Sequence, residues 1–375
     1  MSRIAGLCWS PNCQKLAVAT ADRTVMLFDE NGERRDKFST KPGDPSASRA
    51  SYVIRGLAFS PDSSKLAVAQ SDNIVYVYKL GDNWNDKKVI CNKFAQPMAV
   101  SCMLWLNTGM IIAGLEDGRV RALNCKNNKS QNLYGTEAMV VALASNSKGT
   151  GIVSGHDDGS VIRFYVVEEN SEPSGRLFQH SVPPSALAWT SGGIVAAGSD
   201  RKVNFYDWQG KLQRSFDYSR DDNEREFMIA TCSPNGQAVA IGSFDRIRIY
   251  TWSPRQNSWS ESLCKDIANL YSITALSWRK DGSRLSVGTV CGAVVNFESV
   301  IRRTIWQDKF EITFVAPSQV LLKSLQDPTN SMIVESQMGL EIDDVRIMGK
   351  LVECSELDQK FFHHSRQGQL LGRSN

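Results

Sequence analysis

Hydrophobic and polar residues alternate along most of the chain in short segments, and these segments recur with a period of roughly 45 residues. Residues 4–29 read IAGLCWSPNCQKLAVATADRTVMLFD, and residues 54–79 read IRGLAFSPDSSKLAVAQSDNIVYVYK. The same template returns in segments that begin at Val100, Val140, Pro184, Phe227 and Ile273. The pattern therefore predicts seven repeat units between Ile4 and about Gln307.

Each unit predicts four short antiparallel strands. A first strand ends near an aromatic residue such as Trp9 or Phe59, and a second strand is built from small residues, as in LAVA. A turn with an acid follows, then an alternating third strand and a more polar fourth strand. Units of this kind are typical of propeller blades, in which small residues suit the crowding of inner strands around a central channel.

An aspartate occupies the turn after the second strand in six of the seven units. These residues are Asp22, Asp72, Asp117, Asp158, Asp200 and Asp245, and Cys291 takes the corresponding place in the seventh unit. Turn aspartates accept hydrogen bonds from nearby backbone amides, so we expect a structural role for all six. The spacing resembles that of the WD-repeat propellers. The family's Gly-His dipeptide precedes the first strand in none of the units, and its terminal Trp-Asp is replaced, for example by Phe28-Asp29.

The pattern after the seventh unit changes twice. Strand-like alternation continues through residues 310–350 and is then lost. We expect an all-β fold in which residues 4–307 form a seven-bladed WD40-type β-propeller. Residues 308–354 are expected to form at most one blade of a second propeller, and residues 355–375 a disordered polar tail.

The closure of the ring depends on its two ends. WD-repeat propellers usually close with an N-terminal strand that completes the last blade, and no residues for such a strand precede Ile4. We therefore expect the seventh blade to take its outer strand from residues 301–306. Blades one and seven would then be joined by side-chain packing alone, which predicts a weak seam.

Composition and charge exclude several classes of protein. The 43 basic and 40 acidic side chains are interleaved along the chain, so no basic footprint for nucleic acid is present. No apolar run is long enough to cross a bilayer, and the N-terminus alternates like a strand instead of showing a signal-peptide core. The nine cysteines are odd in number and include no C-x-x-C pair. We expect a soluble, non-secreted protein with reduced thiols.

Candidate catalytic groups are few. His156 lies beside Ser154 and two aspartates in SGHDDG, but we expect neighbours on one tight turn to point apart instead of forming a relay. His180 lies in a connector, and the pair His363 and His364 lacks other ligands at zinc spacing. No P-loop, G-x-G-x-x-G or G-x-S-x-G motif is present. We expect no enzyme activity, cofactor or metal; a propeller enzyme with acids at the channel mouth is an alternative.

The most charged stretch, FDYSRDDNEREF, spans residues 216–227 and connects the fifth unit to the sixth. In a propeller, such connectors share one rim with the aspartate turns. Five arginines should therefore lie on that rim, namely Arg23, Arg201, Arg220, Arg225 and Arg246. Mixed charges on a rim favour protein docking, and we expect these arginines to bind a partner. A solvated loop with internal ion pairs is the alternative.

Longer phrases carry a closer resemblance. GERRDKFSTKP (32–42), DNIVYVYKLGDNWNDKKVICNKF (72–94), FDYSRDDNEREF and NLYSITALSW (269–278) resemble the N-terminal WD-repeat propeller of the largest peripheral subunit of intraflagellar transport complex B. The resemblance covers residues 4–350. In that family a second propeller and a helical solenoid follow, so we expect this chain to be a truncated or alternatively spliced form.

This resemblance implies a non-catalytic scaffold or adaptor subunit of the intraflagellar transport train, acting in cilium assembly. It implies a cytoplasmic location at the cilium or ciliary base. It also implies docking to other complex B subunits, including a calponin-homology-like, coiled-coil subunit. A coat-like scaffold of vesicle traffic shares the propeller-plus-solenoid plan and is the alternative function.

Overall fold

The computed structural model describes residues 2–44, 51–81, 83–84, 86–167, 174–267, 269–327, 331–336, 339–348, 351–356 and 361–365. Within this part of the chain, the regular elements are β-strands, and they form nine antiparallel sheets. In each sheet the strands pair in chain order, as expected for short hairpin connections. The predicted all-β class is confirmed.

The first seven sheets follow the repeat. The first contains β1 (Ile4–Trp9), β2 (Leu16–Thr20), β3 (Thr24–Phe28) and β4 (Arg34–Ser39), and the second contains β5 (Ile54–Phe59), β6 (Lys65–Gln70), β7 (Ile74–Lys79) and β8 (Val89–Ala95). The third contains β9 (Val100–Trp105), β10 (Met110–Leu115), β11 (Arg119–Asn124) and β12 (Lys129–Gly135), and the fourth contains β13 (Val140–Ser145), β14 (Gly151–His156), β15 (Ser160–Tyr165) and β16 (Gly175–Gln179). The fifth contains β17 (Ala186–Thr190), β18 (Gly193–Ala197), β19 (Lys202–Tyr206) and β20 (Leu212–Asp217). The sixth contains β21 (Ile229–Cys232), β22 (Ala238–Gly242), β23 (Arg246–Ser253) and β24 (Ser258–Asp266), and the seventh contains β25 (Ile273–Trp278), β26 (Arg284–Thr289) and β27 (Val294–Glu298).

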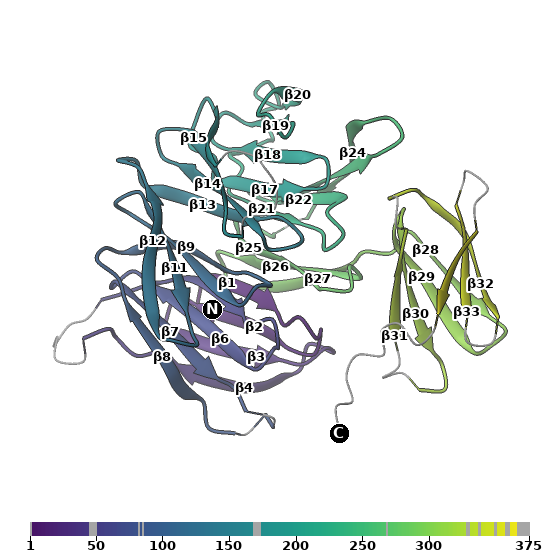
Figure 1. Ribbon diagram of the computed structural model, residues 1–375, viewed down its shortest axis with the longest axis horizontal. Coiled ribbons are helices and arrows are strands. Elements are labelled where there is room, and N and C mark those ends of the chain that lie inside the picture. The colour runs from purple at the N-terminus through teal and green to yellow at the C-terminus, as the bar shows by residue number, and fades with distance from the viewer. Residues whose placement is uncertain are drawn as a thin grey trace.

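Two further sheets follow. The eighth contains β28 (Arg302–Trp306), β29 (Phe310–Ala316), β30 (Gln319–Ser324) and β31 (Ser331–Glu335), and the ninth contains β32 (Ile342–Met348), β33 (Leu351–Glu356) and β34 (Phe361–Ser365). Figure 1 shows these two sheets as a second unit beside the first seven, whose first strands β1, β9, β13, β17, β21 and β25 lie together at the centre.

The core lies between neighbouring sheets instead of within any one of them. One cluster joins the first and second sheets through Leu27, Leu66 and Tyr76, and similar clusters link each sheet to the next along the chain. A further cluster joins the seventh sheet back to the first through Ala275, Ile4 and Leu7. Because each sheet buries its faces only against its neighbours, the first seven sheets form a ring.

The small residues of the second strands are explained by this packing. A Cβ atom on Gly242 of β22 would come within 2.8 Å of Cγ2 of Ile273, the first residue of the next sheet. Gly288 of β26 meets Ile4 in the same way, with 2.6 Å to Cγ2. The seventh and first sheets therefore meet by the same close approach as the sixth and seventh.

The seventh sheet differs from the prediction. It has three strands in the structure, and residues 302–306, expected as its outer strand, pair instead with β29 in the eighth sheet. The register runs from Arg302 opposite Phe314 to Trp306 opposite Phe310, across a three-residue turn (307–309). Trp306 packs against the hydrophobic cluster of the eighth and ninth sheets, and this apolar burial favours pairing with β29 over pairing with β27. The predicted outer strand of the seventh unit is therefore wrong.

The eighth and ninth sheets share their own hydrophobic cluster, which includes Phe314, Val320, Ile342 and Val345. This second unit contacts the ring at Gln237, a turn residue of the sixth sheet. The Gln237 side chain accepts a hydrogen bond from Ser318 Oγ (2.5 Å) and donates one to the Gly339 carbonyl (3.2 Å). The structure thus has two sheets where at most one blade was expected, and β34 lies where a tail was expected; residues 366–375 fall outside the described part of the chain.

Candidate functional site

The aspartate turns and the connectors between sheets lie side by side. At the start of a connector, a backbone amide donates a hydrogen bond to a carbonyl of the aspartate turn, and the described residues contain six such bonds. Three of them are Gln96 N to Asn73 O (2.7 Å), His180 N to Gly159 O (2.8 Å) and Tyr218 N to Arg201 O (3.0 Å). We call these turns and connectors the connector rim. Its six hydrogen-bonded pairs are at Arg23 and Thr40, Asn73 and Gln96, Gly118 and Thr136, Gly159 and His180, Arg201 and Tyr218, and Asp245 and Ile267.

Five of the six turn aspartates accept hydrogen bonds. Asp72 Oδ2 accepts from the Gly43 amide (2.7 Å), and Asp200 accepts from Ser181 Oγ (2.6 Å) and from the Lys202 amide (3.2 Å). Asp22 accepts from Thr20, Asp117 from Arg119, and Asp158 from Ser160. The Ser160 hydroxyl bond lowers the pKa of Asp158 below its ordinary value. Within the described part of the chain, the Asp245 carboxylate accepts no side-chain or amide hydrogen bond, so it lacks the kind of contact that the other five form.

Replacing Asp200 by alanine is expected to lower the free energy of unfolding by about 1 kcal/mol, because it removes the bonds from Ser181 and Lys202. Asp245→Ala is the matched control, and its urea midpoint should stay close to that of the unmodified chain. Equal midpoints for both variants, or a loss of partner binding in Asp200→Ala without a change in melting temperature, would contradict a structural role.

Two arginines of the rim hold unusual backbone conformations. Arg23 and Arg201 follow the turn aspartates with φ of 69° and 58°, in the left-handed region that side chains with a Cβ rarely adopt. Glycine takes this place in the third and fourth sheets, at Gly118 and Gly159. Arg201 uses the position to donate hydrogen bonds to the carbonyls of Ser219 (2.6 Å), Asp221 (3.2 Å) and Glu224 (3.5 Å). Its guanidinium group therefore fastens the charged connector.

The charged connector contains a buried acid. Glu224 is 0% exposed, and its Oε2 accepts from Nε and NH2 of Arg248, both at 2.7 Å. Oε1 accepts from Ser243 Oγ at 2.7 Å. Arg246 NH1 lies 3.6 Å from Oε2 and also pairs with Asp221 and Asp266. The connector is therefore held on β23 by a carboxylate whose Oε2 contacts two guanidinium nitrogens and whose Oε1 accepts from a hydroxyl.

The same network extends outward through the sixth sheet. Arg248 also pairs with Glu261 on β24 and lies 3.7 Å from the ring centroid of Tyr218. The Tyr218 hydroxyl donates to Glu261 Oε2 (2.7 Å) and lies 2.8 Å from the Tyr250 hydroxyl. Burial alone would lower the pKa of Arg248, but its bonds to Glu224 and Glu261 raise the pKa above its ordinary value. This guanidinium is a permanent charge within the sheet.

These contacts show that the five arginines predicted for the rim differ in exposure and in pairing. The side chain of Arg246 is only 11% exposed and is ion-paired, so it is not an exposed charge. Arg201 is half-buried and donates hydrogen bonds to the connector. Arg23 stacks on Tyr52 at 4.6 Å. Arg220 and Arg225 are exposed and make no ion pair within the described part of the chain. Glu224 was missed in the sequence; the available signal was Arg248, a charge flanked by Ile247 and Ile249 in a buried strand.

Arg225 lines a pocket of about 470 Å³ on the connector rim, which we call the rim pocket. Met228 and Phe244 also line it, and they are 50% and 41% exposed. Tyr271, 46% exposed, contacts the Phe244 ring at 6.3 Å between centroids. Glu224 and the exposed Glu226 also line the rim pocket, which therefore combines charges of both signs with exposed apolar side chains.

The histidine of SGHDDG also corrects a prediction. Ser154 and His156 lie two residues apart on β14, on the same face, and Ser154 Oγ lies 2.8 Å from His156 Nε2. Tyr134 donates to Ser154, and Nδ1 of His156 lies 2.9 Å from the Ala138 carbonyl. The two side chains therefore do meet, contrary to the expectation that they point apart. Both are 0% exposed, so the cluster is closed to a substrate and links the third sheet to the fourth.

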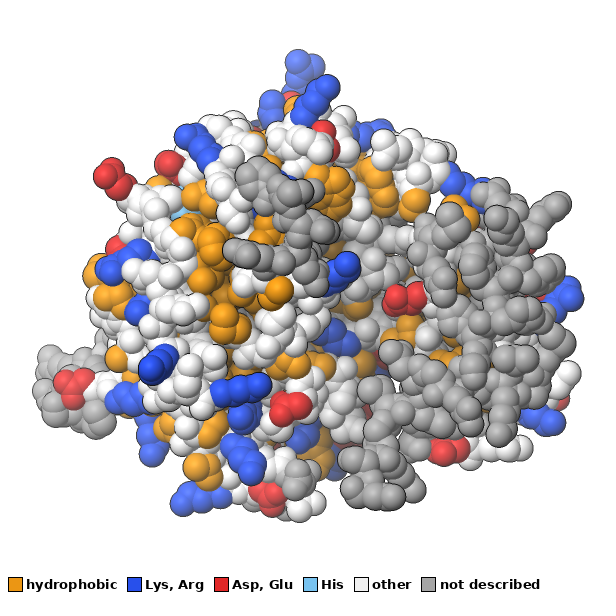
Figure 2. Space-filling view, in the orientation of Figure 1, with side chains coloured by type: hydrophobic (Ala, Val, Ile, Leu, Met, Phe, Trp, Pro, Cys, Tyr) orange, Lys and Arg blue, Asp and Glu red, His pale blue; other side chains and the backbone are white. Residues whose placement is uncertain are grey.

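Basic, acidic and hydrophobic side chains are interspersed on the surface of the molecule. Figure 2 shows Lys and Arg side chains in several separate places on the visible face, among Asp, Glu and hydrophobic side chains. In the described part of the chain, no group of three or more His, Cys, Asp or Glu side chains is arranged to hold a metal ion. No described helix is long and apolar enough to span a membrane.

Comparison with known proteins identifies the repeat and a set of relatives. The family model of the WD40 repeat, "WD domain, G-beta repeat", matches residues 2–29 and 46–79. A chain in the crystal structure of the mitotic checkpoint complex superimposes with a TM-score of 0.63 at 20% identity, covering 78% of this chain and 86% of that one. At this identity, the likeness shows the fold alone.

Three relatives match nearly the whole chain. It is 64% identical over 350 residues to the Intraflagellar transport protein 172 homolog of Drosophila melanogaster, covering 93% of this chain and 20% of that protein. The Homo sapiens homolog is 50% identical over 375 residues (100% and 21%), and Intraflagellar transport protein 172 of Chlamydomonas reinhardtii is 43% identical over 353 residues (92% and 20%). The chain spans about a fifth of the length of these relatives. It belongs to the intraflagellar transport protein 172 family and corresponds to the family's N-terminal WD-repeat region.

Proposed function

We propose that the chain is a non-catalytic scaffold subunit of the intraflagellar transport train, working at the cilium and its base. The observation that carries this proposal is the 64% identity to the Drosophila homolog over 350 residues, together with equally long matches in human and algal proteins. The alternatives, a vesicle-coat scaffold and a propeller enzyme, have no comparable support. A tagged chain should accumulate at the ciliary base and not on Golgi membranes.

The ring of the first seven sheets is, in this proposal, a seven-bladed propeller over residues 4–298, and the eighth and ninth sheets begin a second propeller. The intersheet clusters that run round the ring and return from Ala275 to Ile4 support the first part. The shared core of the last two sheets, separate from the ring clusters, supports the second. A propeller offers rigid rims on which loops of several blades can act together.

The connector rim is the proposed docking surface for other complex B subunits. Arg220 and Arg225 project from a connector that Glu224 and Arg201 hold in place, so little side-chain or loop ordering is needed on binding. Exposed Met228, Phe244 and Tyr271 beside Arg225 supply apolar area for an interface core. A coiled-coil subunit with acidic and apolar positions, such as the calponin-homology-like subunit that the resemblance implies, suits this combination.

The double variant Arg220→Glu/Arg225→Glu is expected to retain less complex B partner in a pull-down at physiological salt, by about tenfold in affinity. Its melting temperature should not change, because exposed unpaired charges contribute little to stability. The matched control is Arg34→Glu/Lys37→Glu, which reverses two exposed charges on β4. Unchanged retention by the rim variant, or equal loss in the control, would count against docking at this rim.

A further inference from the structure

A cavity lies at the opposite ends of the first strands from the connector rim. It has a volume of about 810 Å³ and is lined by residues of six of the seven ring sheets, from Pro11 after β1 to Lys280 after β25. The first strands begin at the connector rim and end at this cavity, which we call the central cavity. Its size is within the range of ligand-binding clefts.

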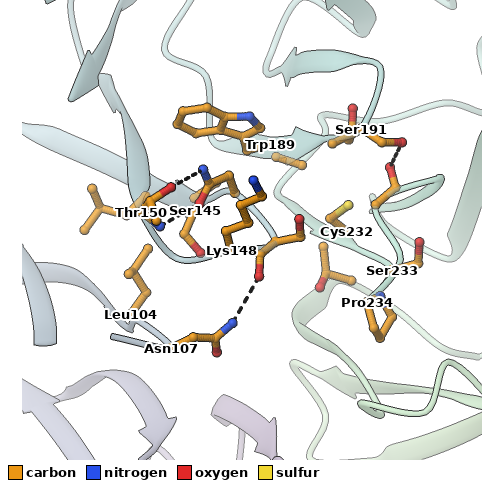
Figure 3. Close-up of a pocket in the computed structure, with 18 of the residues that line it drawn as sticks. Leu104, Asn107, Ser145, Lys148, Thr150, Trp189, Ser191, Cys232, Ser233 and Pro234 are labelled. Carbon is orange, nitrogen blue, oxygen red and sulfur yellow. Dashed lines mark hydrogen bonds between the residues drawn. The ribbon is translucent and has the colours of Figure 1, made fainter. Parts of the chain in front are cut away.

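The charged side chains that line the central cavity are all positive. Among its lining residues, only Lys148 and Lys280 are charged, and neither has an ion-pair partner within the described part of the chain. Arg246, Arg248 and Arg279 of the neighbouring sheets are all paired with acids. Figure 3 shows the Lys148 side chain in the middle of the cavity, between Trp189 and Asn107. Two uncompensated cations that share one concave surface favour an anionic ligand.

The walls supply further donors and apolar surface. The hydroxyl groups of Ser145, Ser147 and Thr231 line the cavity and form no hydrogen bond with the described part of the chain. Trp105 and Trp189 line it as well. Asn107 Nδ2 donates to the Ser147 carbonyl (3.0 Å), and Ser191 Oγ donates to the Gly236 carbonyl (2.9 Å), so neighbouring turns are tied together and the walls are preformed. Preformed walls reduce the entropy cost of binding.

The geometry points to an acidic segment of a partner protein as the ligand of the central cavity. Its carboxylates would accept hydrogen bonds from Lys148, Lys280 and the unbonded hydroxyls, and an apolar side chain would pack on Trp105 or Trp189. Two separated lysines and hydroxyls suit carboxylates spaced along a peptide. Lysines also bind phosphate as point charges, so inorganic phosphate is a competing ligand in the test; no arginine lines the cavity to hold a phosphate by two parallel hydrogen bonds.

The test measures binding of a short fluorescein-labelled peptide of glutamate, aspartate and glycine with one leucine, by fluorescence anisotropy with the full chain. The same peptide with glutamine and asparagine in place of the acids is the probe control. The acidic peptide should bind more tightly, and its affinity should fall as salt is raised. Lys148→Glu/Lys280→Glu should weaken it by at least about tenfold.

Lys126→Glu/Lys211→Glu makes the same change of charge at exposed lysines outside the cavity and should bind as the unmodified chain does. If the cavity variant fails to fold, Lys148→Gln/Lys280→Gln replaces it, with the same direction expected. Equal affinity of both variants would overturn the proposal. So would tighter binding of a single-stranded oligonucleotide or of inorganic phosphate with the same lysine dependence. Because the connector rim is untouched, failure here leaves the pull-down test of docking independent.

Discussion

Replacing Glu224 by alanine is expected to lower the free energy of unfolding by about 3 kcal/mol or more. The substitution leaves Arg248, whose side chain is 7% exposed, with Glu261 as its remaining close acid, and it removes the acceptor of the Ser243 hydroxyl. Breaking a buried ion pair from one side costs more than the pair contributes, because the remaining charge is left desolvated. Urea denaturation followed by tryptophan fluorescence measures the change.

The neighbouring Glu226→Ala is the matched control, since Glu226 is exposed on the same connector. The free energy of unfolding of this variant should change by only a few tenths of a kcal/mol. Glu224→Gln keeps an acceptor for Ser243 but removes the charge, and it should fall between the two. If the alanine variants at 224 and 226 behave alike, the Glu224 network is not what holds the connector on β23.

Trp9→Ala is expected to open the seam between the first and seventh sheets, at a cost of about 3–5 kcal/mol. Trp9 is 4% exposed, its indole Nε1 donates to Ser286 Oγ (2.8 Å), and its backbone amide donates to Ser277 Oγ (3.2 Å). These contacts cross from β1 to the seventh sheet, which has no fourth strand. Amide exchange should therefore accelerate in β1 and β25 to β27 more than in the middle sheets.

Trp105→Ala is the comparison, because Trp105 ends β9 at the corresponding position but is half-buried and donates to Gly109 within its own sheet. Its cost should be smaller, and the loss of protection should be confined to the third sheet and its neighbours. A uniform rise in exchange over the whole ring after Trp9→Ala would mean that the seam is no weaker than the other junctions.

The repeat could be predicted from the sequence because each unit carries its own local signals. Alternation, small second strands and turn residues are short-range properties, and they gave the four-strand order of the first six sheets. The aspartate turns could be predicted for the same reason, because Ser160, which donates to Asp158, lies only two residues away along the chain. The resemblance of whole phrases to a transport subunit depended on text such as RRDKFSTKP, and the long matches to the 172 homologs agree with it.

The roles of single charged residues were decided by the tertiary structure. Arg220, Arg225 and Arg246 read alike in the sequence, yet Arg246 is enclosed by Asp221, Glu224 and Asp266, while the other two face solvent. Residues 302–306 have strand character that fits either neighbour, and their pairing with β29 depends on competition between two partners. Burial and pairing are properties of segments brought together from distant positions, so local pattern determined the strands and their turns, whereas packing between sheets determined which charges are structural and which are available to a partner.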